Sequence, residues 1–100
     1  MDKIEIIEKL HQYRLLLMNH FDLDKVYLFG SYAKNTNSAE SDIDVAIIVN
    51  RLEGDYFATT PILWKLRRQI DDRIEPILIE KGKDQSGFVD EIMKYGIEIV

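Results

Sequence analysis

The chain has 100 residues, of which 46% are hydrophobic and 31% charged, a composition typical of one globular domain and not of a disordered chain. It lacks cysteine, which excludes disulfides and thiolate metal sites and fits a cytoplasmic setting. Its formal net charge of −5 argues against direct nucleic-acid binding, and no apolar run is long enough for a membrane span or a signal peptide.

The first third of the chain predicts one helix and one strand. Apolar residues at helical spacing predict a helix over residues 3–20, and residues 21–24 then form a short connection. The β-branched and aromatic run at 26–29 predicts a strand that ends at Gly30. Residues 31–34 fit a short helical turn, which leads into a polar loop.

The run of residues 42–49 predicts a second strand, which alternates between two faces. One face carries Ile43, Val45 and Ile47, and the other carries Asp42, Asp44, Ala46 and Ile48. Beyond the two aspartates the strand is apolar on both faces, which is typical of a central position in a sheet.

A second helix is expected over residues 56–72, from the spacing of its isoleucines and leucines. Two starting points are open. Thr60 could cap the helix with Pro61 as its first residue, or Asp55 could cap it earlier.

The last third predicts a strand, a helix and an apolar tail. Residues 74–79 form the strand, and Pro76 within it indicates an edge position or a strand start. Ser86 is the expected cap of the last helix and Gly96 its stop, and residues 97–100 form a possible fourth strand. This order predicts an α/β (α+β) fold in which helices pack mainly on one side of a small sheet.

Asp42 and Asp44 stand at the mouth of the second strand. An i, i+2 pair on a strand points both side chains the same way, with Cβ atoms roughly 6–7 Å apart. Such a pair is suited to Mg²⁺, which prefers oxygen ligands and takes substrate phosphates as further ligands. The alternative is a solvated strand start. Carboxylates at the end of a central apolar strand nevertheless need solvent or positive charge, which a metal ion would supply.

Gly30 and Ser31 form a corner between a strand and a turn. Backbone N–H groups at such a corner, with the Ser31 hydroxyl, can bind phosphate oxygens, although a plain corner capped by Ser31 is the alternative. Ten residues separate Ser31 from Asp42, and both lie at the ends of apolar strands. A phosphate site and a metal pair would then face the same cleft, as nucleotidyl transfer requires.

This combination of Gly30-Ser31, ten residues and Asp42-x-Asp44 resembles the signature of the minimal nucleotidyltransferase (MNT) domain of the DNA polymerase β superfamily. The resemblance covers most of the chain. It implies a nucleotidyltransferase fold with a small mixed sheet of three or four strands, and one minimal domain over residues 1–100.

The resemblance also implies roles for individual residues. Gly30 and Ser31 match the pair that binds the triphosphate of ATP, and Asp42 and Asp44 match the carboxylates that hold Mg²⁺. Glu75 is the best match for a third carboxylate, which completes the metal site and helps to activate the attacking hydroxyl. Asp71 and Asp72 are possible substitutes, although they fit the end of the second helix better.

The chain departs from the family pattern at two places. Glu75 stands where an Asp is usual. Lys34 and Asn35 replace an Arg-Gly pair, so Lys34 keeps the positive charge expected of a nucleotide-binding residue and loses the planar fork of arginine.

The stand-alone form of the domain resembles the antitoxin that adds AMP to a tyrosine of a helical HEPN-type toxin, which implies a hetero-oligomer. The alternatives are an antitoxin that acts by contact alone, and a small-molecule nucleotidyltransferase that works with a separate substrate-binding subunit. Some of the aromatic side chains could form an interface, but Phe57 and Trp64 are expected to pack in the core.

Overall fold

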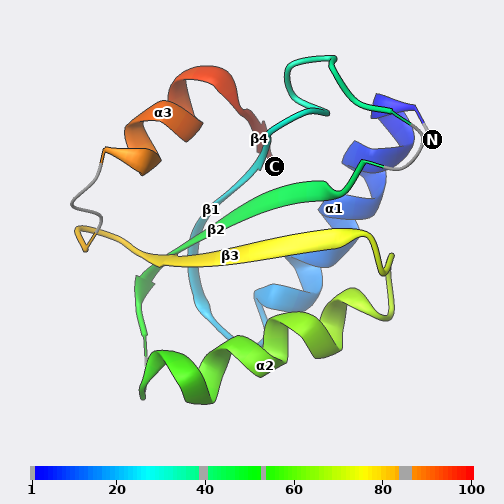
Figure 1. Ribbon diagram of the computed structural model, residues 1–100. Coiled ribbons are helices and arrows are strands. Elements are labelled where there is room, and N and C mark those ends of the chain that lie inside the picture. Colours follow the sequence, from blue (N-terminus) through cyan, green and yellow to red (C-terminus); the bar gives the residue numbers. More distant parts are fainter. Residues whose placement is uncertain (1, 39–40, 53, 84–86) are drawn as a thin grey trace.

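The computed structural model describes residues 2–38, 41–52, 54–83 and 87–100. Its elements in chain order are α1 (Lys3–Leu17), β1 (Asp22–Phe29), β2 (Ile43–Arg51), α2 (Tyr56–Arg67), β3 (Ile74–Glu80), α3 (Phe88–Tyr95) and β4 (Ile97–Ile99) (Figure 1). The strands form one sheet in the order β3-β2-β1-β4. The sheet is mixed, because β1 is antiparallel to β2 and β4 while β2 and β3 are parallel. The predicted mixed α/β fold is confirmed.

The two faces of the sheet carry different layers. The larger core lies where α1 and α2 cover one face, and it contains Ile43, Val45 and Ile47 of β2. A smaller core lies under α3 on the other face, and it contains Ala46 and Ile48. The predicted alternation of β2 is therefore confirmed, and it places Asp44 on the face of the sheet that carries α3.

Strand β1 is longer than its apolar run predicted. It begins at Asp22, so residues 22–24 belong to a strand and not to a connection. The reason is that β2 extends to Arg51, which pairs with Asp22 across an irregular stretch of the ladder. A polar segment becomes a strand here because a neighbouring strand supplies its hydrogen-bond partners.

Both long helices end earlier than predicted, α1 at Leu17 and α2 at Arg67. The side chain of Asp55 accepts a hydrogen bond from the N–H of Ala58 at 3.0 Å, so α2 has the earlier of its two possible caps. A start at Thr60 is wrong, and Pro61 lies inside the helix. Gly96 ends α3 as predicted, and Ser86, the expected cap of α3, lies outside the described residues.

Pro76 lies in β3, which is an edge strand as its proline indicated. The carbonyl of Arg73 and the N–H of Lys81 form hydrogen bonds to β2. In a parallel pair the backbone groups of alternate residues point to the same neighbour, so the N–H and C=O groups of the even-numbered residues point to the free edge. Proline lacks an N–H group and fits such a position. The Arg67 guanidinium covers part of this edge, since it donates to the carbonyl of Ile74 at 2.9 Å.

Phe57 and Trp64 are exposed, so their expected place in the core is wrong. Phe57 is 84% exposed and Trp64 37%. The two residues are seven positions apart and share a face of α2, whereas Leu63 and Leu66 supply the face that packs on the sheet. The Arg67 guanidinium lies 4.4 Å from the centre of the Trp64 ring.

Within the part of the chain that the structure describes, none of the helices combines the length and the apolar character that a membrane crossing requires.

Candidate nucleotide and metal site

Three strand ends bring the predicted site residues together. Phe29, the last residue of β1, pairs with Asp44 in β2, and Asp44 pairs with Glu75 in β3. Residues that pair directly across neighbouring strands point to the same face of a sheet. Asp44 therefore lies between the Gly30 corner on one side and Glu75 on the other, and Asp42 lies just before β2.

Gly30 is in direct contact with Asp44. Its φ of +74° lies in the left-handed region, which glycine adopts without strain. A Cβ atom at this position would stand 3.1 Å from Cγ of Asp44 and would overlap its Oδ2 atom. Glycine is required here both for its backbone conformation and for the close approach of the carboxylate.

Residues 30–35 form a single tight turn, as the sequence predicted for most of this segment. The N–H of Lys34 donates to the carbonyl of Gly30 at 3.1 Å, and the N–H of Thr36 donates to the carbonyl of Ser31 at 2.9 Å. Asn35 closes the turn with a φ of +59°. Asparagine is among the few residues that tolerate this conformation, so Asn35 can replace the glycine that is common in the family pattern.

The electrostatics of the site suit a cation. Burial raises the pKa of Asp44, and the charges of Asp42 and Glu75 raise it further. Asp42 is exposed, and Asp44 and Glu75 are half-buried, so all three residues are at least partly accessible to solvent. Hard oxygen donors with excess negative charge fit Mg²⁺.

The carboxylates do not form a closed cage. Among the described residues, no group of three or more Asp, Glu, His or Cys side chains stands close enough together to hold a metal ion. Mg²⁺ commonly binds through one or two carboxylates and completes its ligands with water and substrate phosphates. The donor set beside Gly30 is of that open kind.

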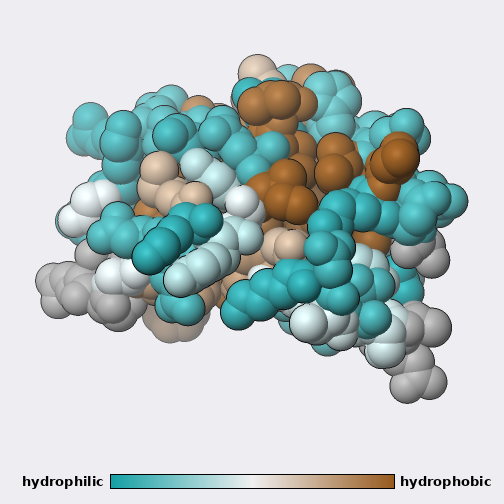
Figure 2. Space-filling view, turned by 90° about the horizontal axis from the view of Figure 1, so that it is seen from above, coloured by the Kyte–Doolittle hydropathy of each residue, from teal (hydrophilic) through white to brown (hydrophobic). Residues whose placement is uncertain are grey.

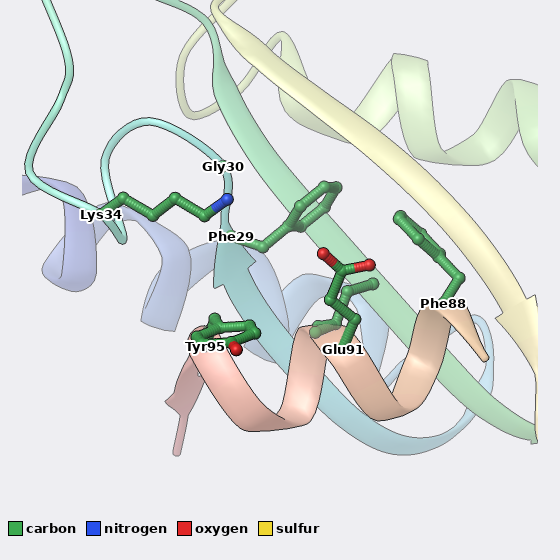
Figure 3. A pocket seen from close by; sticks show the side chains of 8 residues that line it. Phe29, Gly30, Lys34, Phe88, Glu91 and Tyr95 are labelled. Carbon is green, nitrogen blue, oxygen red and sulfur yellow. The ribbon is translucent and has the colours of Figure 1, made fainter.

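A pocket of about 190 Å³ lies beside Gly30. Figure 3 shows the Lys34 side chain reaching toward it from the turn, and the Glu91 carboxylate facing it from α3. Phe29 and Phe88 form part of its wall and meet edge to face, with ring centres 5.7 Å apart. Seen from above, the molecule gathers hydrophobic side chains in one area bordered by hydrophilic ones (Figure 2).

Sequence reasoning missed the contribution of α3 to this pocket. The sequence predicted a last helix between Ser86 and Gly96 but not where that helix would pack. Asp71, considered as a substitute for Glu75, is engaged elsewhere, since its carboxylate lies 2.9 Å from the Nζ atom of Lys9.

Comparisons with known proteins identify the family of the chain. Residues 8–100 match the family model described as polymerase beta, nucleotidyltransferase. A relative from Methanocaldococcus jannaschii, named as a candidate protein adenylyltransferase, is 34% identical over 101 residues, which cover 99% of this chain and all of that protein.

Two solved structures are similar in fold. A toxin–antitoxin complex with AMP-PNP shares 25% identity at a TM-score of 0.67, covering 92% of this chain and 72% of the other. A complex of MNT antitoxin with a tri-AMPylated HEPN toxin of Shewanella oneidensis shares 22% identity at a TM-score of 0.62, covering 96% and 71%. The chain belongs to the polymerase β nucleotidyltransferase family and is a nucleotidyltransferase.

Proposed function

We propose that this chain, as a single minimal domain, transfers AMP from ATP to a tyrosine hydroxyl of a HEPN-type toxin and so acts as an antitoxin. One observation carries the proposal. The carboxylate of Asp44 packs against Gly30, and the charges of Asp42 and Glu75 act on it, so the phosphate corner and the acidic residues share one site. Support also comes from a 34% identical relative that is named as a candidate protein adenylyltransferase.

Each site residue has a role in this reaction. The Gly30 amide, the Ser31 hydroxyl and the Lys34 amino group hold the β- and γ-phosphates of ATP. Asp42 and Asp44 would hold Mg²⁺, which would neutralise charge on the phosphates. Glu75 is too far from them to complete a group of three ligands in this structure, and would join the metal site only with the ion bound. Glu75 also accepts the proton of the acceptor hydroxyl. The hydroxyl oxygen then bonds to the α-phosphorus in line with the departing pyrophosphate, whose bond breaks.

The partner assignment rests on similarity and on exposed aromatic side chains. The solved complexes that resemble this chain contain a toxin, in one case a tri-AMPylated HEPN protein. Phe57 and Trp64 lie on one exposed face of α2, and aromatic residues are enriched at protein interfaces. We propose a hetero-oligomer in which these residues contribute to the contact.

The experiment incubates the chain with ATP labelled at the α-phosphate, Mg²⁺ and the protein encoded by the neighbouring gene. The wild-type chain is expected to label that protein on tyrosine, and Asp42→Ala and Asp44→Ala are expected to abolish the label. Asp22→Ala is the matched control, because it removes an exposed aspartate from the start of β1, at the opposite end of that strand from Gly30.

Toxin neutralisation measured in parallel separates transfer from contact. If Asp44→Ala transfers no AMP but neutralises the toxin as well as the wild-type chain does, the antitoxin acts by binding, and the proposal that AMP transfer neutralises the toxin is wrong. Omission of Mg²⁺ by chelation tests the metal requirement in the same assay.

A further inference from the structure

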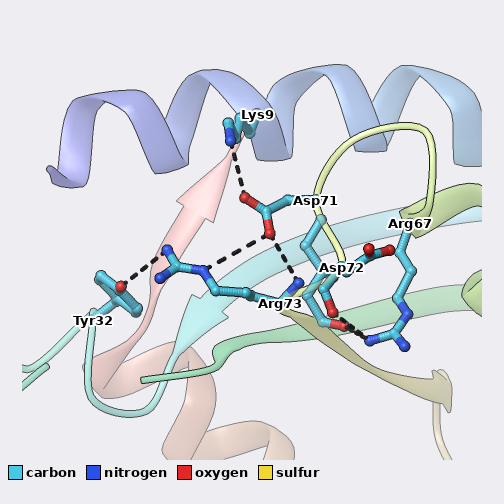
Figure 4. Close-up of polar contacts among 7 residues, drawn as sticks. Lys9, Tyr32, Arg67, Asp71, Asp72 and Arg73 are labelled. Atoms are coloured by element: carbon cyan, nitrogen blue, oxygen red, sulfur yellow. Dashed lines mark hydrogen bonds and ion pairs between the residues drawn. The ribbon is translucent and has the colours of Figure 1, made fainter. Parts of the chain in front are cut away.

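Figure 4 shows a polar network between α1 and the start of β3. Because α1 and α3 cover opposite faces of the sheet, this network lies on the opposite face from Asp44, at the same end. Its centre is Asp71, whose carboxylate accepts a hydrogen bond from Nζ of Lys9 in α1 at 2.9 Å. The same carboxylate accepts the backbone N–H of Arg73 at 2.9 Å and lies 3.8 Å from Nε of Arg73. The network therefore anchors Arg73 to α1 through both its backbone and its side chain.

Arg73 extends from this anchor to the Gly30 corner. Its Nη2 atom donates to the hydroxyl of Tyr32 at 3.3 Å. Tyr32 is 2% exposed, lies in the main core and directly follows Ser31 in the chain. The Arg73 guanidinium therefore holds the turn that carries the proposed phosphate contacts from the inner side.

The backbone of Arg73 also contacts the two metal-binding segments. Its carbonyl accepts the N–H of Ile43 at 2.8 Å, and Ile43 lies between Asp42 and Asp44. Glu75 follows Arg73 by two residues in the chain. One residue thus touches the turn, touches the start of β2 and leads into the third carboxylate.

Such a junction matters because catalysis depends on distances between groups. A displacement of about 1 Å at a reacting centre can lower the rate roughly 10²-fold. The planar guanidinium can form an ion pair with Asp71 through Nε and donate to Tyr32 through Nη2 at the same time, which an ammonium group on a flexible stem cannot reproduce.

We propose that Arg73 is a positioning residue that sets the distance between the Gly30-Ser31 turn and the three carboxylates. It acts through Tyr32 and Ile43 and does not touch the substrate. The inference rests on the proposed roles of the site residues in nucleotide binding and transfer.

The test uses the full chain and the matched pair Arg73→Lys and Arg67→Lys. Arg67 contacts the same segment as Arg73, because it donates to the carbonyls of Asp72 and Ile74. It differs from Arg73 in that it binds the outer edge of β3 and not the Gly30-Ser31 turn. We expect Arg73→Lys to lower kcat/KM for labelled AMP transfer about 10- to 100-fold, whereas Arg67→Lys stays within about threefold of wild type. Thermal melting of both variants measures their structural effect.

Tyr32→Phe supplies a second variant that removes only the hydroxyl. We expect a smaller loss of kcat/KM, and the double variant Tyr32→Phe/Arg73→Lys should be no worse than Arg73→Lys, because the two residues share one contact. AMP-PNP binding with Mg²⁺, measured by calorimetry, should weaken about tenfold in Arg73→Lys and remain unchanged in Arg67→Lys.

The inference is overturned if Arg73→Lys and Arg67→Lys lose melting temperature and kcat/KM in equal measure, since Arg73 would then be a purely structural residue. A wild-type chain that binds AMP-PNP but labels no protein contradicts the proposed function alone. In that case the calorimetric comparison of the two lysine variants decides the role of Arg73. A wild-type chain that binds no nucleotide overturns both.

Discussion

Asp44 and Asp71 are both partly shielded carboxylates at the same end of the sheet, but they lie on opposite faces in opposite surroundings. Asp71 faces α1, where Lys9 and Arg73 bond to its carboxylate. Asp44 faces the α3 side, where the charged groups that shift its pKa are the carboxylates of Asp42 and Glu75. Positively charged groups of the chain therefore neutralise Asp71. The charges that act on Asp44 are negative, which favours a cation from outside the chain.

Their pKa values reflect this difference. Burial raises the pKa of Asp71, but the Arg73 backbone N–H, the Lys9 hydrogen bond and the charges of Lys9 and Arg73 together lower it below its ordinary value. For Asp44, burial and two negative neighbours act in the same direction and raise the pKa. Perturbation by unmatched like charges in an accessible site is typical of functional residues, whereas matched charges are typical of structural ones.

The largest expected effect separates activity from stability at Asp44. We expect Asp44→Asn to lower AMP transfer by about 10³-fold or more, because a metal-binding carboxylate contributes several kcal/mol to the transition state. The same variant should melt at a higher temperature at pH 7, because it removes a charge that the folded state disfavours.

The pH dependence of melting tests the cause. A carboxyl whose pKa is raised by folding destabilises the folded state when it is ionised, and this penalty disappears as pH falls through the raised pKa. The gain in Asp44→Asn should therefore shrink on acidification. Glu98→Gln removes an exposed carboxylate from β4 and serves as control. If Asp44→Asn melts below the wild-type chain at pH 7, the charge of Asp44 does not destabilise the fold, and the contrast with Asp71 is wrong.

The opposite result is expected at Asp71. Asp71→Asn should lower the free energy of unfolding by about 1–3 kcal/mol at pH 7, because it weakens charge-assisted hydrogen bonds to Lys9 and Arg73. Folding lowers this pKa, so the stabilisation is present above the ordinary value of 3.8 and is lost as pH falls through the folded-state pKa.

Urea unfolding at pH 7 and at pH 3 measures this difference. The gap between wild type and Asp71→Asn should be large at the first pH and smaller at the second. Lys9→Gln removes the cation in place of the anion and should also destabilise the chain. A gap that is independent of pH would show that the charge of Asp71 is not the source of its effect.

The smallest expected effect concerns the turn that joins the two regions, since Gly30 contacts Asp44 and Tyr32 contacts Arg73. Asn35→Ala should lower the free energy of unfolding by about 1 kcal/mol, because alanine is strained at a positive φ. Asn35→Gly should change it by only a few tenths of a kcal/mol, because glycine adopts this conformation freely. Thermal melting distinguishes the two, and equal losses would mean that the left-handed backbone is not the reason for asparagine.

The sequence by itself determined those features that depend on local order along the chain. The alternation of residues 42–49 predicted the two faces of β2, and Pro76 predicted an edge strand, because side-chain direction and hydrogen-bonding capacity are local properties. The spacing from Gly30-Ser31 to Asp42 and Asp44 predicted a shared site at the strand ends, and the family resemblance was confirmed by comparison. The catalytic role of each residue stays a prediction.

Only the tertiary structure decided what each segment packs against. Residues 22–24 became strand because β2 extends beside them, and Phe57 and Trp64 became exposed because Leu63 and Leu66 supply the buried face of α2. Asp44 and Asp71 are both aspartates, and their neighbours in the sequence did not indicate which of them would bond to positively charged side chains. Lys9 lies 62 positions from Asp71, so the hydrogen bond between them forms only when α1 packs on the sheet. Long-range contacts set the environment of a charge, and that environment determines whether it stabilises the fold or remains available to bind a ligand.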